Sequence, residues 1–135
     1  MLITKRGLQM VPVGKAIEYA KMVNAEYGLS DRDEYTEQFI RNLYPLTVSE
    51  DDENGYLWYM IVTDEWGYKC MTILSYYIFP EKRTARNFIN LQRKIESIAK
   101  KEKVKYIEQG SHLNPKVNDI LLKFGYKHAV LRKEM

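Results

Sequence analysis

The chain has 135 residues, 45% of them hydrophobic, which is enough for one sizeable core and too little for two ordinary domains, so we expect a single domain over residues 1–135. Its 21 basic and 18 acidic residues leave a formal net charge of +3, a balance that does not call for nucleic acid as a partner. We find no charged export leader and no apolar run of about 20 residues, so we expect a cytoplasmic protein without a membrane span.

The first half of the chain predicts a short strand followed by two helices. Residues 2–4 are the candidate strand. Apolar residues recur at helical spacing from Ile17 to Tyr27, and Gly28 marks the end of this helix. A second helix begins with the acids of 31–33 and must end before Pro45. The acidic segment 49–55 is expected to be a turn that lies outside the core.

The second half predicts a hairpin and then a parallel unit. Aromatic and β-branched residues fill 56–63 and 68–79, with turn residues between them. A helix from Arg86 and a strand at 104–109 then make a right-handed crossover. The buried face of this helix is expected to consist of Phe88, Leu91, Ile95 and Ile98.

A last helix begins at Pro115 and is closed by Gly125, and residues 126–132 are expected to form a last strand. This order of elements predicts an α/β (α+β) fold, with a mixed, largely antiparallel central sheet flanked by about four helices.

The passage from the second hairpin strand into the next helix is the most informative segment. An apolar strand ends at Pro80, and Arg83 and Arg86 fall at the start of the helix. The start of a helix combines unpaired N–H groups with the positive end of the helix dipole, and both attract anions. We therefore predict an anion site from Arg83 to Phe88. The alternative is a plain connection with a solvated basic turn.

This segment resembles the pyrophosphate loop of the GNAT N-acetyltransferase superfamily, which reads Pro-x-x-Arg-Gly-x-Gly-x-Gly/Ala and is followed by a Leu. Pro80, Arg83 and Leu91 fit that pattern. The three glycine positions differ from it, because they hold larger residues that could occupy space needed by a ligand. These residues are Thr84, Arg86 and Phe88.

A second segment is similar to the Asn-x-x-Ala-x-x-x-Tyr-x-Lys-x-Gly-Phe stretch of the same superfamily. Asn114, Lys123, Gly125 and the aromatic Tyr126 match it. Leu121 stands where the family often has a Tyr that protonates the departing thiolate, and a leucine side chain cannot donate a proton.

The resemblance implies acetyl-CoA as the cofactor and an amine as the acyl acceptor. Glu108 or His112 are the candidates for a general base, with Tyr76 or Tyr77 as a hydrogen-bond donor. Equally, Glu108 could face solvent and His112 could make a local hydrogen bond. The coenzyme-binding residues implied are Ile78, Arg83, Thr84, Ala85, Arg86, Asn87, Phe88 and Asn114.

Two other functions compete with a transferase. The first is a catalytically inactive GNAT-fold protein that binds a protein partner or serves a structural role, as in virion-associated proteins encoded by bacteriophages, which would place it in the virion or the host cytoplasm. The second, a nucleic-acid-binding module, ranks last because the charge is modest. Cys70, His112 and His128 do not form a metal-binding pattern, so we expect no metal. The sequence leaves open whether the chain forms a homo-oligomer.

Overall fold

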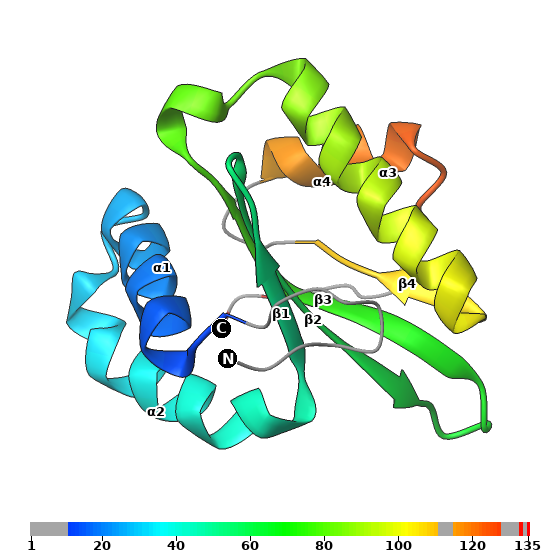
Figure 1. Cartoon of the computed structure of the whole chain (residues 1–135), viewed down its shortest axis with the longest axis horizontal. Helices are drawn as coiled ribbons and strands as arrows, with labels where there is room; N and C mark the ends of the chain where they lie inside the picture. The colour runs from blue at the N-terminus through cyan, green and yellow to red at the C-terminus, as the bar shows by residue number, and fades with distance from the viewer. Residues whose placement is uncertain (1–10, 111–114, 128–132, 134) are drawn as a thin grey trace.

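The computed structural model describes residues 11–110, 115–127, 133 and 135, so the predicted strand at 2–4 and most of the predicted strand at 126–132 lie outside the described residues. In the described part, α1 and α2 lie on one side of the sheet, and α3 and α4 lie on the other (Figure 1). The helices are α1 (Val13–Glu26), α2 (Asp33–Leu43), α3 (Ala85–Glu102) and α4 (Pro115–Lys123), and the strands are β1 (Val48–Asp51), β2 (Gly55–Thr63), β3 (Lys69–Ile78) and β4 (Tyr106–Glu108).

The two predicted N-terminal helices are confirmed. α1 begins directly after Pro12 and turns Ile17 and Tyr19 into the core. Gly28, two residues beyond its end, adopts a φ of 68°, a conformation that glycine reaches without the steric cost of a Cβ atom. α2 buries Ile40 and gives way to a short 3₁₀ turn that contains Pro45.

The predicted hairpin is also confirmed. β2 and β3 are antiparallel, with partners running from Gly55–Ile78 to Thr63–Lys69. The connecting turn is organised by Asp64, whose carboxylate accepts hydrogen bonds from the amides of Trp66 at 2.9 Å and Tyr68 at 2.8 Å. Such side-chain bonds to nearby amides are the usual reason for aspartate in turns.

α3 connects β3 to β4 and makes the expected parallel unit. β4 pairs in parallel with β3, and the described strands lie in the order β1-β2-β3-β4. This arrangement confirms the predicted α+β class, a mixed and largely antiparallel sheet with helices on both faces. The hydroxyl of Tyr106 in β4 donates to Asp64 at 2.7 Å, which ties the new strand to the hairpin turn.

The prediction of an acidic turn over 49–55 is wrong for its first residues. Val48–Asp51 form β1, and both Ser49 and Glu50 are buried. Each finds a polar partner far away in the sequence: Ser49 Oγ accepts from the Val11 amide at 3.2 Å, and Glu50 Oε1 lies 2.6 Å from Lys94 Nζ of α3. Such partners let polar residues enter a core, and composition alone does not reveal them.

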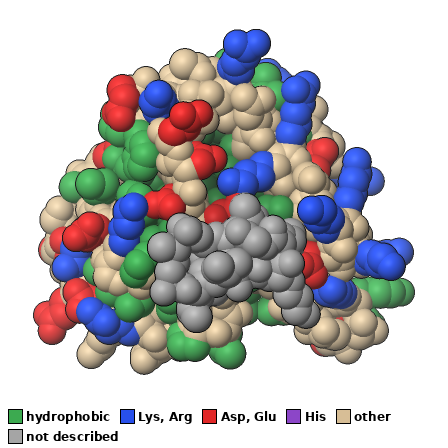
Figure 2. Space-filling view, viewed as in Figure 1, with side chains coloured by type: hydrophobic (Ala, Val, Ile, Leu, Met, Phe, Trp, Pro, Cys, Tyr) green, Lys and Arg blue, Asp and Glu red, His purple; other side chains and the backbone are tan. Residues whose placement is uncertain are grey.

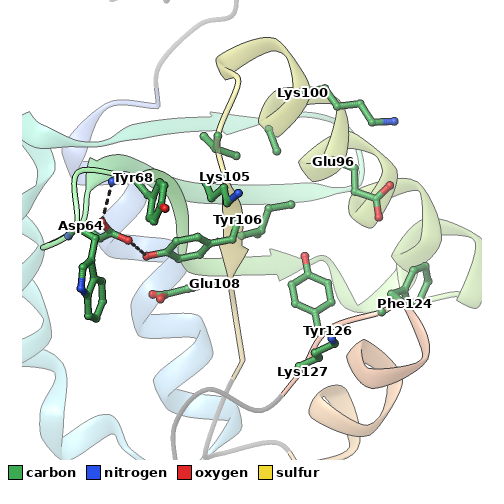
Figure 3. Close-up of a pocket in the computed structure, with 15 residues that line it drawn as sticks. Asp64, Tyr68, Glu96, Lys100, Lys105, Tyr106, Glu108, Phe124, Tyr126 and Lys127 are labelled. Atoms are coloured by element: carbon green, nitrogen blue, oxygen red, sulfur yellow. Dashed lines mark hydrogen bonds between the residues drawn. The ribbon is translucent and has the colours of Figure 1, made fainter.

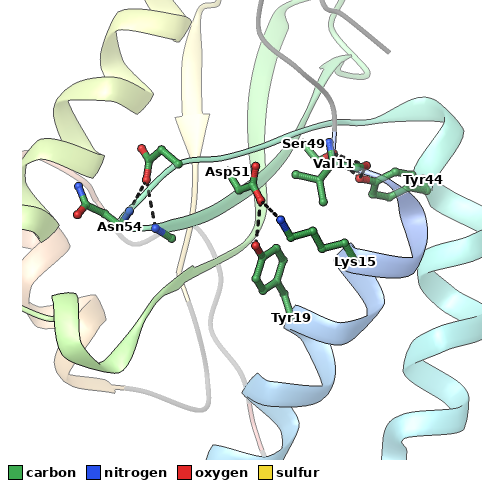
Figure 4. A network of polar contacts seen from close by, with 9 residues as sticks. Val11, Lys15, Tyr19, Tyr44, Ser49, Asp51 and Asn54 are labelled. Atoms are coloured by element: carbon green, nitrogen blue, oxygen red, sulfur yellow. Dashed lines mark hydrogen bonds and ion pairs between the residues drawn. The ribbon is translucent and has the colours of Figure 1, made fainter. Parts of the chain in front are cut away.

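A further polar network fastens β1 to α1 on the face of the sheet that α1 covers (Figure 4). Asp51 Oδ2 accepts from Tyr19 Oη at 2.9 Å and lies 2.9 Å from Lys15 Nζ. Tyr44 adds contacts from its hydroxyl to Val11 O and Ser49 Oγ. Helix α1 is thereby held to the edge of the sheet by side chains as well as by apolar packing.

Two apolar clusters fill the space between the layers. The cluster under α1 and α2 is rich in aromatic rings, including a stacked pair of Tyr19 and Tyr56 with centroids 4.8 Å apart. The cluster under α3 contains Ile95 and Ile98, which confirms them as part of the buried face of that helix, while Phe88 and Leu91 are half-buried. Its strand residues are Leu57, Tyr59 and Met71.

The surface carries both signs of charge. Lys and Arg side chains are most frequent on the right of the face shown in Figure 2, the side of α3, and acidic side chains lie among them. Within the described residues, no helix combines the length and the apolar character that a membrane span requires.

Candidate functional site

The candidate site lies where β3 and β4 separate. The two strands pair only from Cys70–Tyr106 to Thr72–Glu108, after which β3 continues to Ile78 and β4 ends. A cavity of about 750 Å³ lies along the diverging part. Its walls include β3 residues 73–78, the start of α3, the end of α1, apolar side chains of α4, and Gln109 and Gly110, which directly follow β4. We call it the cavity between β3 and β4.

An irregularity in β3 lies beside this cavity. Trp58 pairs with Ser75 but Tyr59 pairs with Ile73, so Leu74 is an extra residue in the ladder. A bulge of this kind bends the strand, increases its local twist and leaves one residue outside the regular pairing. All three β3 residues here, 73–75, line the cavity. The bulge thus lies in the wall of the cavity.

A buried amide pair ties the residue after β4 to α3. Gln92 of α3 is only 2% exposed, and its Oε1 accepts from Gln109 Nε2 at 2.9 Å. Gln109 Nε2 also contacts the hydroxyl of Tyr126. Because Gln109 follows β4 directly, these bonds give its side chain polar partners in α3 and after α4. Sequence analysis missed Gln92, although its spacing from Phe88 and Ile95 places it on the buried face of α3.

The start of α3 forms one end of the cavity. Residues 80–82 make a 3₁₀ turn, and Thr84 caps α3 by accepting from the Asn87 amide at 3.1 Å. Asn87 Nδ2 donates in turn to Lys82 O at 2.6 Å. The predicted transition from strand to helix is therefore present. The cap uses the Asn87 amide, whereas the amides of Ala85 and Arg86 come before the first intrahelical donor, the Phe88 amide, which donates to Thr84 O at 3.1 Å.

Arg83 is already engaged in the free protein. Its Nη2 lies 2.6 Å from Glu26 Oε1 at the end of α1, and its Nε donates to Ile78 O at 2.8 Å. The guanidinium carbon lies 5.2 Å from the ring centroid of Tyr77, a cation–π distance. The Glu26 carboxylate raises the pKa of Arg83 further above its ordinary value. No sequence signal marked Glu26 as the partner of Arg83, because the two lie 57 positions apart.

Tyr76 is one of the phenols of the cavity wall, together with Tyr27 and Tyr77. Its ring packs against Phe88 with centroids 6.3 Å apart, and Phe88 packs in the same way against Phe124. Phe88, at one of the family's glycine positions, therefore forms part of the apolar wall. Burial of the hydroxyl raises the pKa of Tyr76 to about 12. At neutral pH this side chain is a proton donor and not a base.

The raised pKa of Tyr76 predicts a loss of stability in alkali. Below pH 10 the phenol is protonated in both the folded and the unfolded chain, and it adds no pH dependence. From pH 10 to about 12 the unfolded chain releases this proton while the folded chain keeps it, so the free energy of unfolding falls as pH rises. Tyr76→Phe should reduce that fall in urea titrations at pH 9 to 12. Tyr35→Phe, at a side chain 70% exposed, is the matched control and should behave like the parent.

The structure brings most of the implied coenzyme residues together. Ile78, Arg83, Thr84, Ala85 and Phe88 line the cavity, as does the catalytic candidate Tyr76.

The remaining predicted site residues lie elsewhere. Arg86 and Asn87 follow at the helix start but are not part of the cavity wall. Glu108 is exposed and lines a different cavity. His112 and Asn114 lie outside the described residues.

That second cavity, of about 860 Å³, lies against the other side of β4 (Figure 3). Asp64, Tyr68 and Tyr106 stand at one end of it, and Phe124 and Tyr126 at the other. Its acids and lysines alternate without converging on one point, and Asp64 is occupied by the turn amides and by Tyr106. Among the described residues, no group of His, Cys, Asp and Glu is placed to hold a metal ion. The cavity between β3 and β4 is therefore the better candidate.

The chain resembles known proteins in its structure but matches none of the family models or curated proteins by sequence. Solved structures match it over nearly its whole length. One from Pyrococcus furiosus, assigned provisionally to the acetyl transferases, has a TM-score of 0.69 at 22% identity and covers 94% of this chain and 97% of its own.

Two further solved structures also match the fold of this chain. The ribosomal-protein-alanine N-acetyltransferase of Brucella melitensis biovar Abortus 2308 has a TM-score of 0.63 at 13% identity, covering 95% of this chain and 96% of its own. A predicted acetyltransferase from Clostridium acetobutylicum, solved with acetyl-CoA, has a TM-score of 0.63 at 16% identity, covering 91% and 88%. The chain has the GNAT fold. At such identities the likeness establishes the fold, and activity must be argued from the site.

Proposed function

We propose that this GNAT-fold protein is an N-acetyltransferase that transfers the acetyl group of acetyl-CoA to an amine. The observation that carries the proposal is the cavity between β3 and β4, an apolar slot that ends at the capped start of α3 beside Arg83. Its apolar part suits an acyl group and a pantetheine-like chain, and its cationic end suits phosphates.

The chain's residues fit such a coenzyme in three respects. The amides of Ala85 and Arg86 lie at the positive end of the dipole of α3. Arg83 adds a guanidinium group, which is well suited to bidentate contact with phosphate. The bulge at Leu74 interrupts the ladder in the cavity wall, where a backbone amide outside the regular pairing can donate to a carbonyl group.

Acetyl-CoA supplies an activated thioester, and the neutral amine attacks its carbonyl carbon, so that a C–N bond forms, the C–S bond breaks, and the proton lost by the amine passes through solvent to the coenzyme thiolate. The protein's main contribution is to hold the two reactants together. Tyr76 lines the cavity and is protonated at neutral pH, and we assign it a hydrogen bond to the departing sulfur. Leu121 cannot serve this role, because it is an alkyl side chain that is only 3% exposed.

A second function, that of a GNAT-fold protein which binds a partner without catalysis, is favoured by one observation. Thr84 and Arg83, two residues of the loop, already have partners within the chain. The loop is therefore stable without a ligand.

Titration calorimetry with coenzyme A and with acetyl-CoA separates the two functions. We expect binding, and we expect Arg83→Ala to weaken it by about fivefold to tenfold, as the loss of one charge-assisted contact to phosphate would. Arg93→Ala, at an exposed arginine farther along α3, is the matched control and should leave the affinity unchanged. Equal affinities of the parent and Arg83→Ala would remove Arg83 from the site, and no binding by the parent would favour the non-catalytic function.

A further inference from the structure

Glu26 joins α1 to the loop that precedes α3. Its Oε1 lies 2.6 Å from Arg83 Nη2 and accepts from Tyr77 Oη at 3.1 Å. Glu26, Tyr77 and Arg83 all line the cavity between β3 and β4. The guanidinium group that suits a phosphate is thus held by a carboxylate of the same chain at the edge of the site.

The ion pair of Arg83 and Glu26 can exchange its partners with the solvent. The side chains of Arg83 and Glu26 are 42% and 34% exposed, so water and ions reach them. An ion pair at such a position is weak, because solvent screens it. A diphosphate presents more negative charge and more acceptor oxygens than one carboxylate, and the amides of Ala85 and Arg86 would hold it beside Arg83.

Resting on the function proposed above, we propose that Glu26 is a built-in competitor of the coenzyme's phosphates for Arg83. In the free protein the Glu26–Arg83 pair fastens the end of α1 to the loop at 80–84. When a phosphate takes Arg83, this fastening is released. Glu26 then keeps its bond to Tyr77 and presents an unneutralised carboxylate at the cavity.

Glu26→Gln tests the competition. The change keeps the size of the side chain and its ability to accept from Tyr77, but it removes the charge that holds Arg83. We expect the variant to bind coenzyme A about twofold to fivefold more tightly than the parent in calorimetry, the range that corresponds to a surface ion pair. Glu18→Gln, at an exposed acid of the same helix, is the control for net charge and should leave the affinity unchanged.

The same change in an Arg83→Ala background shows whether the gain acts through Arg83. Competition predicts that Glu26→Gln has no effect there, because the contested group is gone. An equal gain in both backgrounds would overturn the inference, since it would reflect general repulsion of an anion by Glu26. No gain at all, in a parent that binds coenzyme A, would overturn the inference and leave the proposed function standing. If neither the parent nor Glu26→Gln bound coenzyme A, both the proposed function and this inference would be overturned.

Discussion

Gly55→Ala is expected to lower the free energy of unfolding by about 3 kcal/mol or more, as overpacking against an unyielding neighbour does. A Cβ atom at this position would lie 2.0 Å from the carbonyl oxygen of Tyr77 and 2.9 Å from Cα of Ile78. Both are backbone atoms of the paired strand and cannot rotate away. The strands would have to separate where β2 begins, and urea unfolding followed by circular dichroism measures the cost.

The same substitution at Gly14 is the matched control. An added Cβ there meets nothing within 4 Å, and the residue lies within α1. Alanine favours a helix over glycine by about 0.5 to 1 kcal/mol, so Gly14→Ala should stabilise the protein. If Gly55→Ala unfolded at the same urea concentration as the parent, the close approach of β2 to β3 at this point would be contradicted.

Ile95→Ala is expected to cost about 2 to 5 kcal/mol, the usual range for removing a buried isoleucine side chain. Ile95 is fully buried between α3 and the sheet. Truncation removes apolar contacts and leaves a cavity that the neighbouring strands cannot close, since the ladder of β2 and β3 holds them in place. The free energy of unfolding from urea titrations is the measurement.

Ile120→Ala provides the comparison for Ile95, because it is the same change in a helix at a side chain that is 40% exposed. It should cost much less, since little apolar surface is newly lost from contact. A loss at Ile95 no larger than that at Ile120 would mean that the buried face of α3 is assigned wrongly.

Periodicity predicted those parts of the fold that depend on neighbours in sequence. Ile95 and Ile98 repeat at helical spacing, and the hairpin has its turn residues between two aromatic strands, so both could be found from the chain alone. Ser49 and Glu50 could not, because their burial depends on Val11 and Lys94, which are distant in sequence. A polar residue enters a core only when its partner arrives, and the partner is set by the tertiary fold.

Part of the candidate site was likewise predictable from the sequence, and part was not. Pro80 and Arg83 marked the strand-to-helix passage, and the cavity lies there. The occupation of Arg83 by Glu26 was hidden, because a single acid in α1 carries no pattern that points to a loop far along the chain. The Gln92–Gln109 pair was hidden as well, since a glutamine on an apolar face is explained only once β4 lies beside α3.

The short pairing of β4 has a consequence for motion. Within the described residues, β4 shares only three ladder positions with β3, whereas β2 and β3 share nine. Local opening requires little free energy where few backbone bonds and contacts must break, so we expect β4 to open more readily than the hairpin of β2 and β3. The cavity therefore has one firm wall, the hairpin strand β3, and on another side Gln109 and Gly110, which directly follow the weakly paired β4. Small excursions of β4 would carry Gln109 and Gly110 with them, and we expect them to change the width of the cavity without disturbing the hairpin that carries the core.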